Sequence, residues 1–203
     1  MAKKKAVPSP QQTSSFTEIF QSHHDSFRTS IKGETDRGTA LVTAAFLEQC
    51  LETILRALFD ANKRKKKSVE PLFEGFGPLS SFSGKISLSY SFSLISDAME
   101  HDLHIIRKIR NEFAHSIVTK NFADSKIGQM VSSMKSCASY WKGPGAPNPD
   151  VFNEPGQLTR TKFAYASGKI SAFLQVSIII IASNEIPMNQ KEDIFAKFGN
   201  DEE

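Results

Sequence analysis

The sequence has little cysteine and no long hydrophobic run. Cys50 and Cys137 are its only cysteines and form no CxxC pair, so we expect two reduced thiols rather than a disulfide framework. The most apolar run, Ile170 to Ala182, contains serine and glutamine and is shorter than the roughly 20 apolar residues of a membrane span. No apolar stretch follows the basic start of the chain. We therefore expect a cytoplasmic protein that does not contact a membrane.

The chain also lacks a strong excess of one charge. Its 25 Lys and Arg residues stand against 22 Asp and Glu, and a net charge of +3 does not by itself indicate nucleic-acid binding. One basic cluster stands out, and it consists of Lys63, Arg64, Lys65, Lys66 and Lys67. It is typical of a solvated connector that offsets the negative end of a preceding helix, and the alternative is a nucleic-acid contact through phosphates.

Motifs for metals and cofactors are missing as well. His23 and His24 are adjacent, and neighbouring side chains on a helix point about 100° apart, which makes a poor chelate. We expect both to lie with Asp25 on a solvated helix face. The glycines between residues 68 and 83 follow no phosphate-binding pattern. We expect no metal and no cofactor.

What is present is helical periodicity, which predicts an all-α protein, a single-domain bundle of about six to seven helices. Residues 1–12 have almost nothing to bury and predict a disordered basic tail; the helical domain would span 13–186, and 187–203 would form a second tail. An apolar loop is expected at 68–83 and a proline-rich loop after Trp141. The apolar spacing predicts helices at about 16–31, 36–62, 82–94, 97–118, 124–140 and 159–184.

The helix at 97–118 carries the most chemistry. Projection at 100° per residue places Leu103, Ile106, Ile109 and Phe113 on a core face. On the opposite face Arg107, Asn111 and His115 follow each other in successive turns, and His104 shares that face. These side chains are the predicted binding or interface residues.

Arg110 projects toward the apolar side of this helix, where an unpaired guanidinium is costly. Glu48 projects among apolar neighbours of the helix at 36–62 in the same way. We therefore expect a structural ion pair between Arg110 and Glu48, with Glu52 as the substitute partner.

Two long motifs point to a known family. The segment 72–96, LFEGFGPLSSFSGKISLSYSFSLIS, followed by DLHIIRKIRNEFAHS at 102–116, resembles the mannitol operon repressor family, with GTALVTAAFLEQCLETIL at 38–55 as its upstream helix. The resemblance covers about Gly38 to Ser116. It implies an all-helical bacterial regulator that negatively controls carbohydrate-uptake genes. No stretch reads as a clear helix-turn-helix, so we expect action through a protein partner more than through direct DNA reading.

The segment RNEFAH at 110–115 is also similar to the Rx4-6H motif of HEPN domains, which are helical bundles that often dimerise and in many members cut RNA. That resemblance implies a HEPN-like bundle and a possible homodimer. It assigns His115 as acid or base, Arg110 as the group that stabilises phosphorane charge, and Asn111 as the residue that orients them. The alternatives to a regulator are therefore a metal-independent endoribonuclease and a toxin- or antitoxin-like module.

Overall fold

The computed structural model describes residues 10–116, 120–136, 138, 141 and 148–182. Seven α-helices and one 3₁₀ turn form this part of the chain, and it contains no strand, so the all-α prediction is confirmed. The elements are α1 Pro10–Ser30, α2 Asp36–Ala61, α3 Lys66–Phe73, α4 Phe82–Ser91, α5 Asp97–His115, α6 Ser125–Ser132, η1 Pro149–Val151 and α8 Gln157–Ala182.

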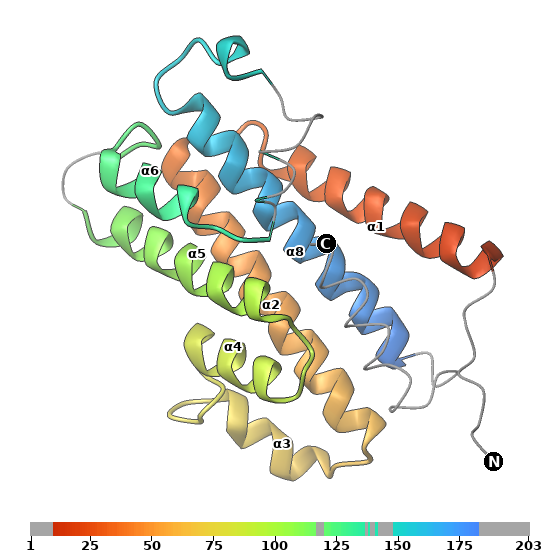
Figure 1. Ribbon diagram of the computed structural model, residues 1–203. Helices are drawn as coiled ribbons and strands as arrows, with labels where there is room; N and C mark the ends of the chain where they lie inside the picture. Colours follow the sequence, from red (N-terminus) through yellow and green to blue (C-terminus); the bar gives the residue numbers. More distant parts are fainter. Residues whose placement is uncertain (1–9, 117–119, 137, 139–140, 142–147, 183–203) are drawn as a thin grey trace.

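The two longest helices, α2 and α8, form the centre of the bundle (Figure 1). The helix α8 packs against both α1 and α2, while α5 lies on another side of α2 and packs against it, α4 and α6. The short helix α3 contacts the end of α2. One continuous core joins these helices, and its largest fully buried side chains include Phe113, Phe122, Phe163, Leu47 and Ile106.

Four helices begin at a residue whose side chain caps the free backbone N–H groups. Thr35, Ser81, Ser96 and Asp124 each accept a hydrogen bond from a backbone nitrogen two or three residues later. Each cap satisfies a donor that has no partner within its helix, which typically contributes about 1 kcal/mol. At the start of α4 the capping residue is Ser81.

Several boundaries differ from the sequence prediction. The helix α1 already begins at Pro10, inside the segment predicted as a tail, because proline is well tolerated in the first turn of a helix. The helix α3 occupies part of the predicted loop, and Pro71 lies near its end. The predicted C-terminal tail and residues 1–9 lie outside the described residues.

The helix α6 ends at Ser132 instead of near Tyr140, and a buried carboxylate accounts for the early end. Asp102 of α5 is fully buried and accepts hydrogen bonds of 2.8 Å from the backbone nitrogens of Lys135 and Ser136. The Nδ1 atom of His101 lies 2.9 Å from the same carboxylate. Because Asp102 satisfies these two N–H groups, the chain can leave the helix there without burying unpaired donors.

The apolar run at 170–182 is part of a core helix, as expected. By length and composition alone α8 could cross a membrane, yet most of its most apolar stretch is buried inside the bundle. Gln157–Ala182 buries Phe163, Ile170, Leu174 and Ile181 against the neighbouring helices. Packing within the protein therefore explains its hydrophobicity.

The expectation for His24 is wrong. This side chain is only 5 % exposed and packs edge-on against Tyr165 of α8, with a ring separation of 5.2 Å. A Cβ atom at Gly168 would lie 2.9 Å from the imidazole, so the glycine makes room for it. Burial lowers the pKa of His24 below its ordinary value of 6.5, and the hydrogen bond with Asp25 opposes this shift only in part.

The one described cysteine is a free thiol, as expected. Cys50 is buried within α2 and forms no disulfide. Burial raises the pKa of its thiol to about 12, so the reactive thiolate is scarce at neutral pH. Cys137 lies outside the described residues.

Candidate functional site

The helix α5 has the two faces that its sequence predicts. Its buried side includes Leu103, Ile106, Ile109 and Phe113, which pack into the core beside α2 and α4. Ser96 caps its start, and acidic residues occupy its first turn, where they interact favourably with the positive end of the helix dipole. The packed and capped helix therefore holds the side chains of its outer face in fixed positions.

The outer face of α5 consists of His104, Arg107, Lys108, Asn111 and His115. Lys108 and His115 are exposed, and the other three are half-buried. The Nε2 atom of His104 lies 3.1 Å from Glu100, one turn earlier. The regular spacing of Arg107, Asn111 and His115 aligns a cation, an amide and an imidazole along the helix, as predicted.

Arg107 is half-buried on this face. Its Nε atom is buried and has no hydrogen-bond partner among the described residues. A buried donor without an acceptor costs about 1–3 kcal/mol. Because this atom is buried, a group from outside reaches Arg107 only through the part of the side chain that remains exposed.

The predicted ion pair between Arg110 and Glu48 is not formed among the described side chains. Glu48 instead accepts a hydrogen bond of 3.0 Å from Lys85 of α4, and Lys85 also lies 3.1 Å from Glu52. The helical projection considered only α2 and α5, whereas α4 packs against both and delivers its own cation. Arg110 remains half-buried at the edge of α5.

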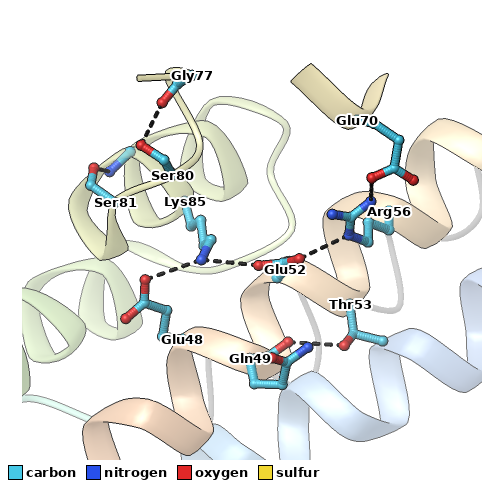
Figure 2. A network of polar contacts seen from close by, with 11 residues as sticks. Glu48, Gln49, Glu52, Thr53, Arg56, Glu70, Gly77, Ser80, Ser81 and Lys85 are labelled. Carbon is cyan, nitrogen blue, oxygen red and sulfur yellow. Dashed lines mark hydrogen bonds and ion pairs between the residues drawn. The ribbon is translucent and has the colours of Figure 1, made fainter. Parts of the chain in front are cut away.

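A chain of alternating charges links α2, α3 and α4 (Figure 2). Lys85 joins Glu48 and Glu52, Glu52 accepts from Arg56 at 2.9 Å, and Arg56 donates to Glu70 at 3.0 Å. The guanidinium of Arg56 also lies 4.1 Å from the centre of the Phe73 ring. This network fixes the two short helices to α2, and it is structural.

Lys85 and Glu52 each lie between two groups of opposite charge in this network. Lys85 is only 6 % exposed and meets a carboxylate on either side. Burial of Glu52 works to raise its pKa, but the hydrogen bonds from Lys85 and Arg56 outweigh burial and hold the pKa below its ordinary value of 4.5. Sequence reasoning missed Lys85, although its position as the single charged residue between Glu74 and Asp97 was a signal.

The end of α5 that carries the RNEFAH segment is tied down by other ion pairs. Glu112 pairs with Lys120 at 3.0 Å and with Lys126 of α6. Arg37 of α2 donates a hydrogen bond of 3.2 Å to the backbone carbonyl of Ala114. These contacts hold the last turn in place while His115 stays exposed.

The ends of α1, α2 and α8 meet close to this region. Arg160 of α8 lies 3.1 Å from Asp36 and donates to Thr39 at 2.8 Å and to the carbonyl of Glu34. Asp36 also accepts a hydrogen bond of 2.9 Å from the backbone nitrogen of Phe122. This cluster joins distant parts of the chain, and no local pattern could have predicted it.

The basic run from Lys63 to Lys67 is divided between two elements. Lys63, Arg64 and Lys65 connect α2 to α3, while Lys66 and Lys67 form the first turn of α3. All five side chains are exposed. The run therefore lies in the α2–α3 connector and the first turn of α3, and no residue of it is on α5.

A comparison with models of known protein families matches residues 31–183 to a family described as mannitol repressor. The match covers more than half of the chain and extends beyond the segment 38–116 that carried the resemblance. No curated protein and no solved structure matches the chain.

Proposed function

Because the chain belongs to the mannitol repressor family, we propose that it represses carbohydrate-uptake genes by binding a protein partner through the outer face of α5. The face consists of His104, Arg107, Lys108, Asn111 and His115. The alignment of Arg107, Asn111 and His115 in successive turns carries the proposal, because it places a cation, an amide and an imidazole side by side opposite the packed face of the helix. A carboxylate or backbone carbonyl of a partner would accept hydrogen bonds from the exposed parts of these side chains.

The composition of this face supports a protein partner. It combines charge-assisted and neutral hydrogen-bonding groups on a helix whose opposite side is fully packed. Arginine is frequent among interface residues that contribute most to binding, and a rigid helix loses little entropy when it docks. The face is therefore suited to specific contact with another protein.

Direct reading of DNA receives less support. A recognition helix needs exposed side chains that reach base edges and a basic surround that contacts phosphates. On α5 the cations alternate with Glu100 and Glu112, and the basic run of residues 63–67 lies on other elements. Such an arrangement favours weak phosphate contact without sequence reading.

An operator-binding measurement tests this proposal. We expect the purified protein to bind labelled mannitol-operator DNA and a scrambled duplex equally weakly, and to lose both between about 50 and 200 mM salt. A K65Q/K66Q/K67Q variant should show a shallower salt dependence, because it removes three phosphate contacts. Tight binding to the operator alone that persists at the higher salt concentration would contradict the proposal.

A second candidate function is a metal-independent endoribonuclease of HEPN type. Glu48 is engaged by Lys85, which leaves Arg110 free of the carboxylate that was expected to neutralise it. His115 is exposed at the end of the same helix. In this alternative, Arg110 would stabilise charge on the phosphorus oxygens, His115 would transfer the proton and Asn111 would orient both.

RNA cleavage tests the second candidate. If it holds, the wild-type protein cleaves single-stranded or structured RNA in the presence of EDTA and leaves 2′,3′-cyclic phosphate ends. Replacing His115 with alanine should lower that activity by at least about a hundredfold, since proton transfer typically contributes that much. Intact RNA after incubation with wild-type protein would eliminate this function, and equal cleavage by both proteins would indicate a contaminant.

A further inference from the structure

The helix α1 is held to the bundle mainly by one neighbour. It packs along the outer side of α8 (Figure 1), and the ring of Phe27 also lies 5.5 Å from that of the uncharged Phe46 of α2. The described side chains of α1 add none to the buried residues of the continuous core, against which Phe20 packs half-buried. The residues matched to the mannitol repressor family begin directly after α1, at position 31. The helix α1 is therefore a cover on α8.

The surface of α8 beneath α1 is apolar. Gly168 lies under α1, because a Cβ atom at this position would lie 2.9 Å from the ring of His24. The residues that follow Gly168 at intervals of four share one ridge of the helix with it. They are buried outside the continuous core, and they are Ala172, Val176 and Ile180. We call these four residues the covered ridge. Since α1 packs on the side of Gly168, its removal would expose this ridge to solvent.

A histidine is buried in the contact between α1 and α8. The side chain of His24 is only 5 % exposed. Its Nδ1 atom lies 3.3 Å from the carboxylate of Asp25, and its Nε2 atom is buried without a hydrogen-bond partner among the described residues. A neutral imidazole has one N–H donor, which Asp25 can accept, whereas an imidazolium has two. Protonation of His24 would therefore place a second donor in the contact where no acceptor meets it.

The charges around His24 oppose its protonation as well. Asp25 and Arg28 are the charged groups of α1 that act on it, and Lys169 is the charged group of α8. The ring of Tyr165 packs edge-on at 5.2 Å, and α8 contains no acidic residue. Burial lowers the pKa of His24 below 6.5, Arg28 and Lys169 lower it further, and the hydrogen bond with Asp25 opposes these effects only in part. The contact is thus built for a neutral imidazole.

We propose that α1 is a pH-sensitive cover, which lies on α8 while His24 is neutral and detaches when His24 takes up a proton. The docked state disfavours the charged form, whereas detached His24 is free to ionise near its ordinary pKa of 6.5. Docking is therefore most stable above that pH and weakens as the pH falls below it. Most helical stability in proteins comes from packing, so the detached α1 unfolds and the covered ridge becomes an exposed apolar surface.

The protection of α1 amides against hydrogen exchange tests the proposal. Between about pH 7.5 and about pH 5.0 the protection factors of α1 should fall at least about threefold, with a ceiling of about thirtyfold because the lower pH is about 1.5 units below 6.5. Protection factors are corrected for intrinsic exchange, so values at the two pH values can be compared directly. Amides of α2 and α5 should keep their protection, because these helices belong to the continuous core.

Two variants remove the titrating group in different ways. H24N offers a side-chain N–H to Asp25 without an ionisable group, and H24L fills the site with an apolar side chain. In each variant we expect the protection of α1 to be equal at the two pH values, whatever its level at neutral pH. H23N is the matched control. His23 is half-buried and points about 100° away from its neighbour, so this variant should respond to acid as wild type does.

Binding of a dye to apolar surface reports the covered ridge itself. The fluorescence of anilinonaphthalene sulfonate should rise in acid with wild type and H23N, because the exposed ridge binds the dye. It should not rise with H24N or H24L.

Constant protection of α1 in the wild type at both pH values would overturn the proposal. An equal acid-induced loss in H24N and H24L would overturn it too, as would an equal loss throughout α2 and α5, because the whole bundle would then open. These measurements use the protein alone and change no residue of the outer face of α5. Their failure would therefore leave the proposed function untouched.

Discussion

Replacing Lys85 with alanine is expected to lower the free energy of unfolding by about 3 kcal/mol at neutral pH. Lys85 is buried and lies between Glu48 and Glu52, at 3.0 and 3.1 Å. Without the ammonium group, Glu48 would have no cation within the described residues and two carboxylates would face each other. For a domain of this size the melting temperature should fall by about 6–12 °C, measured by circular dichroism or calorimetry.

Two further variants separate charge from packing. K85M keeps most of the side-chain volume but not the charge, so it should lose nearly as much stability as K85A. Adding E48Q to K85M removes one of the stranded carboxylates and should restore part of the loss. Lys32 is exposed between α1 and α2, and K32A should unfold as the wild type does. A K85A protein within about 1 kcal/mol of wild type would show that the network contributes little.

The pH dependence of the K85A effect follows from Glu52. Its folded pKa lies below the ordinary value of 4.5, so its ion pairs stabilise the protein above that pH and lose this effect as the pH falls through the folded pKa. The difference between wild type and K85A should therefore shrink in acid. A difference that is constant down to about pH 3 would contradict this role.

The helices could be predicted from the sequence because apolar spacing and capping residues depend only on residues within or next to the same helix. The apolar spacing of α2, α5 and α8 marks the faces that pack into the core, and the caps Ser81 and Ser96 are readable from sequence. The two faces of α5 follow from the same periodicity. The family resemblance over 38–116 was also confirmed, within a wider match.

The errors came from contacts between residues that are distant in sequence. His24 is buried because its ring packs against Tyr165 of α8 and Gly168 leaves room for the imidazole. The helix α6 ends early because Asp102 of α5 accepts hydrogen bonds from the backbone nitrogens that follow α6. Glu48 binds Lys85 because α4 reaches α2. A helical projection assigns a residue to a side of its own helix, but it does not identify the helix that packs there.

The corrected position of Glu48 also changes the candidate site. Arg110 was expected to be neutralised by that carboxylate, which would have left Arg107, Asn111 and His115 as the displayed residues. His115 is exposed, while Arg107 and Asn111 are half-buried and the Nε atom of Arg107 is buried. The outer face of α5 therefore stays the proposed contact surface, and Arg110 joins the residues that a ligand could meet.

The largest effect on repression is expected from replacing the three aligned side chains of the outer face of α5 with alanine. An R107A/N111A/H115A variant should lose repression of a mannitol-operon reporter by at least about tenfold, because interface residues of this kind often contribute 2 kcal/mol or more each. The core side of α5 is unchanged, so the variant should fold and accumulate normally. A melting curve and an immunoblot check both points.

The matched control is R28A, which makes the same arginine-to-alanine change at an exposed position of α1. It should repress the reporter as wild type does, and it shows that a lost surface cation alone has no effect. Single variants at Arg107, Asn111 and His115 then show which side chain contributes most, and Arg107 is expected to rank first.

Reporter expression in cells carrying wild type, R107A/N111A/H115A or R28A is the most direct measurement of the regulatory proposal. The proposal predicts derepression with the triple variant at normal protein level and full repression with R28A. Full repression by a stably folded R107A/N111A/H115A protein would contradict it.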